Sequence, residues 1–305
     1  LRGKQETEAV QIELTSLLAG RGFPRTTTRN AIQKWGAKAA RIIRRDPYRL
    51  MAFKGTGFKK TDAMYLDLGL KPDRLKRQAL CAWYSIASDC DGNTWFPAGR
   101  ATNYILQNIT GAAVDPELAL RLAIRAKALS EEYTRGVLGP IVQETSQIRW
   151  IAEGKNAKHE QQIAEIVSRA RLDSHRWPDP SGIAGLSDHQ REQLTKALAS
   201  PIAILGGSPG TGKTYTAGLL IQELGKTFGL NNILIAAPTG KAAVRLTENL
   251  VKLGIDIRAR TVASWLNWLD RQKETTVFPH QVIVVDEDSM SDTDAKAALL
   301  RGAAR

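Results

Sequence analysis

The sequence predicts an α/β protein whose C-terminal part holds a parallel sheet, preceded by an all-α region and a small mixed domain. Three observations support this fold class. After residue 183, apolar strand-like runs alternate with helical patterns, as they do in parallel sheets. Residues 207–214 (GSPGTGKT) satisfy the eight-residue phosphate-loop pattern. Residues 1–80 have helical periodicity that two glycine-rich tetrapeptides interrupt.

Length and composition narrow the class of protein. A chain of 305 residues with 43% hydrophobic residues can form two or three domains, each with its own core. No apolar run approaches the length of a membrane span and the N-terminus lacks signal-peptide character, so we expect a cytoplasmic protein without a membrane partner. Cys81 and Cys90 lack metal-ligand spacing and are expected to be reduced, non-catalytic thiols. A disulfide between them is the alternative in an oxidising compartment.

The net charge of +12 is concentrated in one N-terminal block. Residues 21–80 contain sixteen Lys or Arg residues and four Asp or Glu residues, which accounts for the whole excess. This distribution is typical of a module that binds a polyanion. A basic face kept for solubility is the alternative.

Residues 1–78 are predicted to form a tandem helix-hairpin-helix region, with helices over 8–18, 27–35, 37–44 and 60–68. The interrupting tetrapeptides are residues 20–23 (GRGF) and 55–58 (GTGF), and each leads into a basic helix start. Glycines allow a tight hairpin whose N–H groups, with the next helix N-terminus, can hold a DNA phosphate. The residues expected to contact DNA here are Gly20, Gly22, Arg25, Gly55, Gly57, Lys59 and Lys60. An ordinary helical turn with a capping glycine is the alternative for either copy.

Residues 79–150 are predicted to form a small winged-helix-like domain. Its expected elements are a turn with a short extended piece at 91–97 and helices over 80–88, 99–107 and 115–128. Trp95 and Phe96 are expected to lie in the core, because large aromatic side chains usually do. Stacking on the bases of a single strand is the alternative.

Residues 151–182 are predicted to be a helix, over 155–172, followed by a linker rich in turn residues where we place the main domain boundary. The nucleotide-binding domain is predicted over 183–305. A capped helix begins at Ser187. The expected strands are 202–205, 232–238 and 281–287, with helices over 215–224 and from 239 to 245.

The phosphate loop predicts a nucleotide site. A buried strand over 202–205 is expected to aim the loop, and glycines let backbone N–H groups surround phosphate oxygens. Lys213 then places a cation on the β and γ phosphates, and Thr214 supplies a hydroxyl to Mg²⁺. The predicted loop residues are Gly207, Ser208, Pro209, Gly210, Thr211, Gly212, Lys213 and Thr214. A glycine-rich turn that binds nothing is the alternative.

Asp286 and Glu287 supply the second half of the predicted site. They end a Val/Ile run, and Asp286 lies 72 residues after Thr214. Asp286 is expected to contact Mg²⁺ together with Thr214, and Glu287 to align or deprotonate the attacking water. With Lys213 they are the predicted catalytic residues. The alternative is an exposed, charged strand end without a ligand.

The order of five segments resembles a known family. Gln190 and residues 207–214, 237–243 (APTGKAA), 260–264 (RTVAS) and 286–290 (DEDSM) look like helicase motifs Q, I, Ia, Ib and II. In particular they resemble the RecD-like helicases of superfamily 1, the 5′→3′ branch. Further upstream, residues 46–50 (DPYRL) leading into 55–58 and residues 91–97 (DGNTWFP) are similar to parts of that family's long form.

This resemblance implies that residues 183–305 form the first RecA-like motor domain of a P-loop NTPase. It implies an ATP-dependent 5′→3′ DNA helicase or translocase that acts on single-stranded DNA and duplex junctions in recombination, repair or replication, with ATP and Mg²⁺ as cofactors. Gln190 would then bond the adenine. A single-strand track would be lined by Pro238, Thr239, Lys241 and Thr261.

Several alternatives stay open beside this reading. The chain could be an ATP-binding DNA-binding module without unwinding activity, or the motor part of a relaxase or of a recombination nuclease complex. Charge alone does not separate DNA from RNA, and Lys241 could be a solvated helix-start lysine.

Two departures from the family pattern affect what is expected. Asp288 stands where the family usually has a small residue, which would add a carboxylate near Mg²⁺. The sequence ends eighteen residues after Glu287, and the family's later motifs are not in it. Because a motor closes two such domains on ATP, we expect little turnover from this portion alone.

Overall fold

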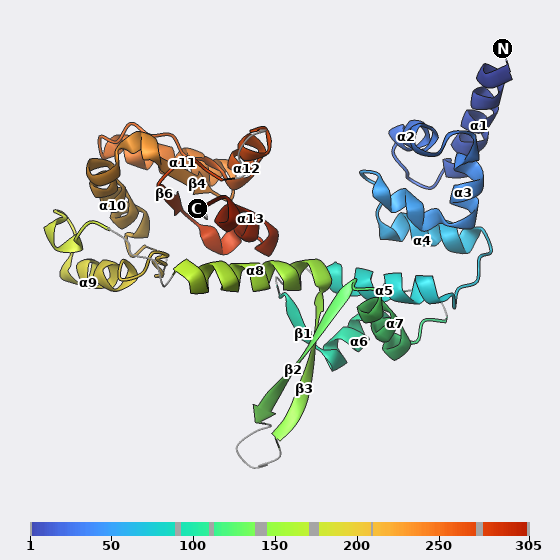
Figure 1. Ribbon diagram of the computed structural model, residues 1–305, viewed down its shortest axis with the longest axis horizontal. Coiled ribbons are helices and arrows are strands. Elements are labelled where there is room, and N and C mark those ends of the chain that lie inside the picture. Colours follow the sequence, from blue (N-terminus) through green and yellow to red (C-terminus); the bar gives the residue numbers. More distant parts are fainter. Residues whose placement is uncertain are drawn as a thin grey trace. The chain divides into compact units, whose positions relative to one another are not determined.

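The computed structural model describes residues 2–88, 93–109, 113–137, 145–170, 177–208, 210–272 and 277–303. The chain forms two compact units, Leu1–Lys155 and Asn156–Arg305, and each is described by itself. Among the described helices, none combines the length and the apolar character that crossing a membrane requires. Figure 1 labels the elements along the chain.

The first half of unit 1 is helical, as predicted. Its elements are α1 (Arg2–Leu18), α2 (Thr26–Trp35), the short η1 (Gly36–Lys38), α3 (Ala39–Arg45), η2 (Pro47–Ala52) and α4 (Phe58–Asp67). One apolar cluster joins these helices, because Leu14, Ala31, Ile43 and Met64 are all fully buried in it. Burial of these helix faces against each other holds the two glycine hairpins in place between the helices.

The second half of unit 1 combines three helices with a three-stranded sheet. Its elements are α5 (Leu75–Ala87), β1 (Trp95–Pro97), α6 (Ala98–Asn108), α7 (Pro116–Arg125), β2 (Leu129–Val137) and β3 (Thr145–Glu153). The sheet is antiparallel with strand order β1-β3-β2. That this part is a winged-helix-like domain stays a prediction. Phe96 is 1% exposed in the core, as expected, and Trp95 is half-buried.

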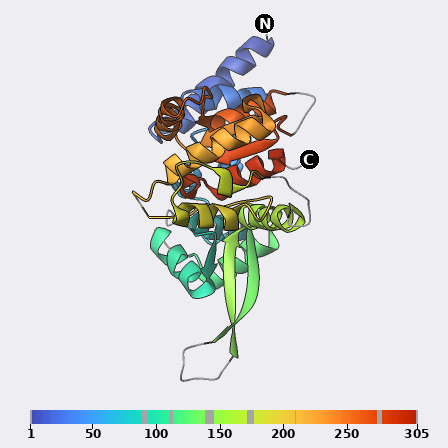
Figure 2. The same cartoon turned by 90° about the vertical axis from the view of Figure 1, so that its left-hand side faces the viewer.

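Strands β2 and β3 were not predicted from the sequence. They pair antiparallel from Leu129 opposite Glu153 to Val137 opposite Thr145. Figures 1 and 2 both show the two strands side by side, extending away from α5, α6 and α7. Strand β2 is mostly polar, whereas β3 carries Ile148, Trp150 and Ala152 at alternate positions, the pattern of a half-buried strand.

Unit 2 contains the predicted parallel sheet, with strand order β5-β4-β6. The strands are β4 (Ile233–Ala237), β5 (Arg260–Thr261) and β6 (Val282–Val285). The helices are α8 (Gly154–Ala170), α9 (Asp188–Ala197), α10 (Lys213–Phe228), α11 (Gly240–Lys252), α12 (Val262–Asp270) and α13 (Thr293–Ala303). The short elements η3 (Pro180–Gly182), η4 (Leu230–Asn232) and η5 (Asp288–Met290) lie between them.

Central strand β4 is buried along its whole length. Its residues alternate between the two faces of the sheet. Ile233 and Ile235 belong to the cluster that includes Leu224 of α10 and Leu246 of α11. Leu234 and Ala236 belong to the cluster formed with α12 and α13. A strand packed on both faces has a continuous apolar sequence, and for this reason β4 could be predicted.

The prediction of a strand over residues 202–205 is wrong. These residues form no strand, and the Ile204 side chain is 86% exposed. Strand β6 pairs with β4, and within the described part of the chain no ladder joins β6 to residues 202–205. A short apolar run becomes a strand only when a neighbour supplies its backbone hydrogen bonds, and periodicity does not encode that neighbour.

Candidate nucleotide and nucleic-acid sites

The phosphate loop leads directly into α10, whose first residue is Lys213. Gly210 and Gly212 have φ values of 80° and 77°, the left-handed region that glycine adopts readily. Gly212 caps the helix without a side-chain hydrogen bond, so the first N–H groups of α10 face the loop uncapped. Helix N-termini of this kind bind phosphate. Pro209, also predicted in the loop, lies outside the described residues.

The loop is folded on itself in this conformation. Lys213 donates from Nζ to the carbonyl oxygens of Gly207 and Ser208, at 2.6 and 2.8 Å. Thr211 donates from Oγ1 to the same Ser208 carbonyl at 2.8 Å. A Cβ atom at Gly207 would lie 2.9 Å from Oγ1 of Thr211, so a larger residue would require the Thr211 side chain to shift. The residues present therefore form a cradle that suits a phosphate once Lys213 turns toward it.

Gln190 lies beside the phosphate loop. A Cβ atom at Gly212 would be 3.1 Å from Nε2 of Gln190. The other amide atom is used locally, because Oε1 of Gln190 accepts from the Ser187 N–H at 3.0 Å. Ser187 Oγ in turn accepts from the Gln190 N–H at 3.3 Å, which completes the capping box of α9. The amide nitrogen of Gln190 is thus the atom directed at the loop.

Asp286 and Glu287 follow the end of β6. The Asp286 N–H donates to the Ala236 carbonyl at 3.0 Å, which extends the pairing of β6 with β4 by one residue. Asp286 Oδ1 accepts from the Glu287 N–H at 3.0 Å. Burial raises the pKa of Asp286, while the positive charges of Arg245 and Lys213 act to lower it. Burial is the largest of these effects, so the pKa of Asp286 is raised overall.

Glu287 has φ = 56° and ψ = 30°, an uncommon left-handed conformation for a residue other than glycine. Strained conformations of this kind recur at functional sites. The next residue, Asp288, is paired with Lys296 of α13 at 3.2 Å. The additional carboxylate that sets this chain apart from the family pattern is thus engaged by a lysine.

The carboxylates of the described residues do not form a metal site by themselves. Across the described ranges there is no cluster of three or more His, Cys, Asp or Glu residues. Mg²⁺ is commonly held by one or two protein groups together with substrate phosphates and water, so this donor set fits a metal that arrives with a nucleotide. The predicted Mg²⁺ residues are Thr214, in the first turn of α10, and Asp286.

The predicted single-strand track lies at the carboxyl edge of the sheet. Ala237 of β4 pairs with Thr261 of β5, so the residues that follow these strands lie at one edge. Thr239 caps α11 by accepting from the Ala242 N–H at 3.2 Å. Thr261 caps α12 by accepting from the Ser264 N–H at 3.0 Å. Pro238 is partly buried, and Lys241 is exposed in the first turn of α11. Their contacts with DNA stay a prediction.

The two glycine hairpins of unit 1 lie against each other. A Cβ atom at Gly55 would lie 2.8 Å from Cγ of Pro24, and one at Gly22 would lie 3.8 Å from Cε of Lys60. Lys60 Nζ donates to the Gly55 carbonyl at 3.1 Å, within the second hairpin. The structure thus brings together two segments that are far apart in the sequence.

Backbone geometry at the hairpins suits anion binding. Gly20, Gly22 and Gly55 have positive φ values of 72°, 68° and 82°, whereas Gly57 is extended. Helices α2 and α4 begin after Arg25 and Gly57, and neither helix has a side-chain cap. Those first N–H groups that make no other hydrogen bond can therefore donate to a phosphate, although at α2 the Thr27 N–H already donates to the Pro24 carbonyl at 2.9 Å. Lys59 lies with Nζ 6.0 Å from the centre of the Tyr84 ring.

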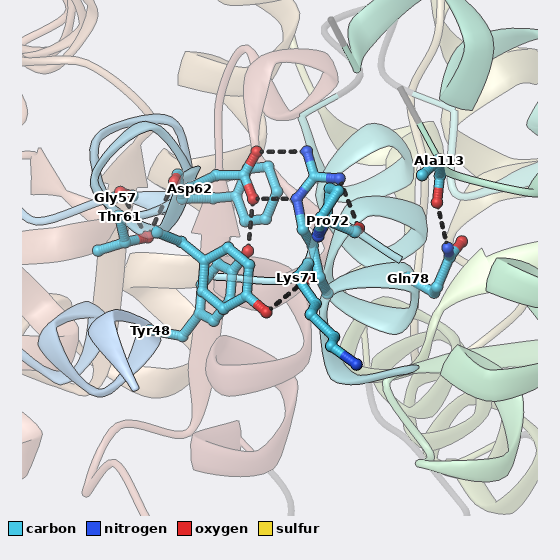
Figure 3. Close-up of polar contacts among 11 residues, drawn as sticks. Tyr48, Gly57, Thr61, Asp62, Lys71, Pro72, Gln78 and Ala113 are labelled. Carbon is cyan, nitrogen blue, oxygen red and sulfur yellow. Dashed lines mark hydrogen bonds and ion pairs between the residues drawn. The ribbon is translucent and has the colours of Figure 1, made fainter. Parts of the chain in front are cut away.

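A buried polar network next to the hairpins was missed by sequence reasoning (Figure 3). Arg77 is fully buried and donates to both carboxylate oxygens of Asp62, from Nε at 2.9 Å and from Nη2 at 3.0 Å. Its Nη1 donates to the Pro72 carbonyl at 2.9 Å, and Tyr48 donates its hydroxyl to Asp62. Burial raises the pKa of Tyr48, and the Asp62 carboxylate raises it further. No local pattern marks these residues, which lie on η2, α4 and α5.

Two parts of the chain match known families. Residues 8–95 match the family described as the ATP-dependent RecD2 DNA helicase HHH domain. Residues 185–305 match the family described as an AAA domain, a nucleotide-binding domain.

Two relatives show how far this similarity extends. The ATP-dependent RecD2 DNA helicase of Deinococcus radiodurans is 25% identical over 314 residues, covering 96% of this chain and 42% of the relative. The RecBCD enzyme subunit RecD of Mycobacterium tuberculosis is 35% identical over 169 residues, covering 47% of this chain and 28% of the relative. The chain therefore spans less than half the length of either relative.

These matches confirm the predicted resemblance to RecD-like helicases. They also confirm the predicted fold class, a helical N-terminal region followed by a domain with a parallel sheet. The bounds of the predicted domains and the roles of the site residues stay predictions.

Proposed function

Since this is a RecD2-like chain, with an HHH domain followed by an AAA domain, we propose that it is part of an ATP-dependent 5′→3′ DNA helicase or translocase. ATP hydrolysis takes place between the phosphate loop and the end of β6. One observation carries the proposal. The loop with left-handed Gly210 and Gly212 leads into the uncapped N-terminus of α10, and Nε2 of Gln190 borders Gly212, so two segments distant in the sequence meet at the phosphate loop.

In the proposed site each residue has a distinct task. Lys213 leaves the carbonyls of its own loop and neutralises the terminal phosphates, while the uncapped N-terminus of α10 donates N–H groups to them. Thr214 and Asp286 would hold Mg²⁺, which would supply Lewis-acid chemistry at the phosphate. Glu287 orients the attacking water. Gln190 donates from Nε2 to the adenine.

DNA is the proposed partner at two places. In unit 2, the carboxyl edge of β4 and β5 presents Thr239, Lys241 and Thr261 to a single strand. In unit 1, the paired hairpins offer uncapped helix N-termini to backbone phosphates. Contacts of the second kind position a strand without reading its sequence. The direction of movement is proposed from the similarity to the RecD-like family.

Phosphate release stimulated by single-stranded DNA, measured on the full-length protein, tests this proposal. Glu287→Gln keeps the size of the side chain and removes its base. We expect ATP binding to persist while hydrolysis falls by about 100-fold or more, since a positioned base contributes about 10²–10⁴-fold. Glu248→Gln, an exposed change on α11, is the matched control. Normal hydrolysis by Glu287→Gln would contradict the proposed mechanism. Unwinding of duplexes with a 5′ tail but not a 3′ tail tests the direction.

A second candidate is a motor subunit of a larger enzyme. A region covering 47% of this chain is 35% identical to a RecBCD subunit, and this similarity favours the second candidate. Unwinding by the purified full-length protein alone supports the first candidate. Unwinding that requires added partner subunits supports the second, and ATP binding without any phosphate release would contradict both.

A further inference from the structure

A cavity of about 660 Å³ lies in unit 1, at a place that neither the hairpins nor the nucleotide site use. Its walls come from α3, η2, α4 and the beginning of α5. Five of its lining residues are cationic, and one is acidic. The cationic ones are Arg41, Arg45, Arg49, Arg74 and Lys76, and the acid is Asp46. The cavity therefore has an excess of four positive charges.

The charges in this cavity are only partly compensated. Asp46 accepts from Lys76 and lies 3.5 Å from Nε of Arg49, so one carboxylate serves two cations. Arg41, Arg45 and Arg74 are exposed and have no carboxylate partner within the part of the chain that the structure describes. Like charges held together on a concave surface create a positive potential that attracts anions.

Two buried tyrosine rings line the cavity. Tyr48 and Tyr65 are 5% and 2% exposed, and their ring centres lie 5.1 Å apart. The Tyr48 hydroxyl donates to Asp62, which Arg77 also contacts, and the Tyr65 hydroxyl donates to the Lys71 carbonyl at 2.8 Å (Figure 3). A surface that is already in place before binding loses little conformational entropy when a ligand arrives.

We propose that this cavity is a second nucleic-acid site of unit 1, in which the guanidinium groups of Arg41, Arg45 and Arg74 bind phosphates of a DNA strand. It differs in chemistry from the hairpins, where backbone N–H groups and helix N-termini would make the contacts. Guanidinium groups suit this task because they bind phosphate with two parallel hydrogen bonds. The inference rests on the proposed function only in naming DNA as the source of the phosphate.

The size of the cavity agrees with this ligand. Sites for small molecules are commonly about 300–1,000 Å³, and 660 Å³ admits a phosphate together with its sugar. Lys76 Nζ lies 5.9 Å from the centre of the Tyr48 ring, so cationic and aromatic groups are interleaved. The same phosphate chemistry is available from internal diesters and from a 5′-terminal monoester. The test below separates these two sources.

Salt-dependent binding of a labelled single-stranded oligonucleotide, measured by fluorescence anisotropy without ATP, tests the proposal. The cavity variant carries Arg41→Gln, Arg45→Gln and Arg74→Gln. The control carries Arg121→Gln, Arg125→Gln and Lys127→Gln, which removes the same charge from exposed positions elsewhere in unit 1. We expect the slope of log K against log[salt] to fall by about 2 in the cavity variant, since each lost phosphate contact contributes about 0.7 on single strands. The control should keep the wild-type slope. If the slope fell by the same amount in both variants, the proposal would be overturned.

Arginine footprinting on the unmodified chain gives a test that does not depend on the folding of a variant. Phenylglyoxal reacts with accessible guanidinium groups, and mass spectrometry reports which arginines a bound oligonucleotide protects. Protection of Arg41, Arg45 and Arg74 by a 5′-hydroxyl oligonucleotide indicates internal diesters. Protection only by the 5′-phosphorylated oligonucleotide indicates the terminal monoester.

If neither oligonucleotide protects these arginines more than it protects Arg121 and Arg125, the proposal fails. Such a failure is distinct from failure of the proposed function. Phosphate release and its dependence on Glu287 report on unit 2 and do not involve this cavity.

Discussion

The ammonium group of Lys213 lies 2.6 Å from the carbonyl oxygen of Gly207, so the lysine of the phosphate loop is bonded to its own loop. A second bond joins it to Ser208 at 2.8 Å. A nucleotide therefore has to draw this lysine away from two carbonyls before its phosphates are neutralised. Both bonds are exposed to solvent, so exchanging them for phosphate oxygens costs little.

Lys213→Ala separates catalysis from folding. We expect DNA-stimulated phosphate release to fall by about 100-fold or more, as occurs when a group that stabilises developing charge is removed. Thermal stability should change little, because the lost bonds are exposed. Lys226→Ala, on the same helix and paired only at the surface with Glu223, is the control. Retained phosphate release in Lys213→Ala would show that hydrolysis occurs elsewhere.

Replacement of Asp62 by Ala tests the buried network of unit 1. It would leave the fully buried Arg77 guanidinium without its carboxylate. Breaking a buried ion pair from one side typically costs about 3–5 kcal/mol, and urea denaturation measures this cost. Arg44→Ala breaks an exposed pair with Glu13 and should cost about 1 kcal/mol or less. A similar small loss in both variants would mean that the network contributes little.

Gly55→Ala tests the contact between the two hairpins. The alanine Cβ would lie 2.8 Å from Cγ of Pro24 at a backbone φ of 82°. Both effects destabilise the folded state, and we expect a loss of more than about 1 kcal/mol. Gly57→Ala is the matched control in the same hairpin, because φ is −66° there and no atom lies within 4 Å. Melting temperatures of the two variants give the comparison, and equal values would refute the proposed contact.

His280 makes stability depend on pH. Burial lowers its pKa below the usual 6.5, and its ring centre lies 5.3 Å from that of Trp265. The unfolded chain thus takes up a proton at a pH where the folded chain does not. This contribution to stability is fully present above pH 6.5 and is lost as the pH falls through the lowered pKa of the folded state.

His280→Phe should therefore reduce the loss of stability between about pH 7 and pH 5, measured by denaturation at each pH. His189→Gln, a change at an exposed position on α9, is the control and should keep the wild-type dependence. If His280→Phe and the wild type lose stability in parallel, His280 is not the titrating group.

Sequence patterns predicted those elements that depend mainly on residues close together in the sequence. The apolar runs at β4 and β6 identified strands, and Ser187 with Gln190 marked the start of α9 through a capping box. The phosphate-loop motif and the acidic pair indicated the candidate site, because phosphate binding and metal binding each need particular residues at particular spacings. The two glycine pairs identified the hairpins for the same reason, since most hairpin glycines adopt a positive φ.

Strands that depend on a pairing partner elsewhere in the chain were missed or wrongly predicted. Strands β2 and β3 pair with each other over nine residues each, and the mostly polar β2 gives no apolar alternation that would mark it as the partner of β3. Residues 202–205 have the apolar run of a strand but no described pairing partner. Strand formation depends on which segments meet, and a one-dimensional pattern does not specify that.

By itself, the sequence determined the fold class, the helical start of the chain and the strands β4 and β6 of the parallel sheet, and it predicted the residues of the nucleotide site. Only the tertiary structure decided that Pro24 lies against Gly55 and that Lys213 is bonded to its own loop. It also decided that Arg77 is neutralised by Asp62, whereas Arg41, Arg45 and Arg74 line a cavity without carboxylate partners in the described chain. The physical reason is that spacing encodes backbone geometry and buried faces, whereas compensation of charge depends on groups that folding brings together from distant positions.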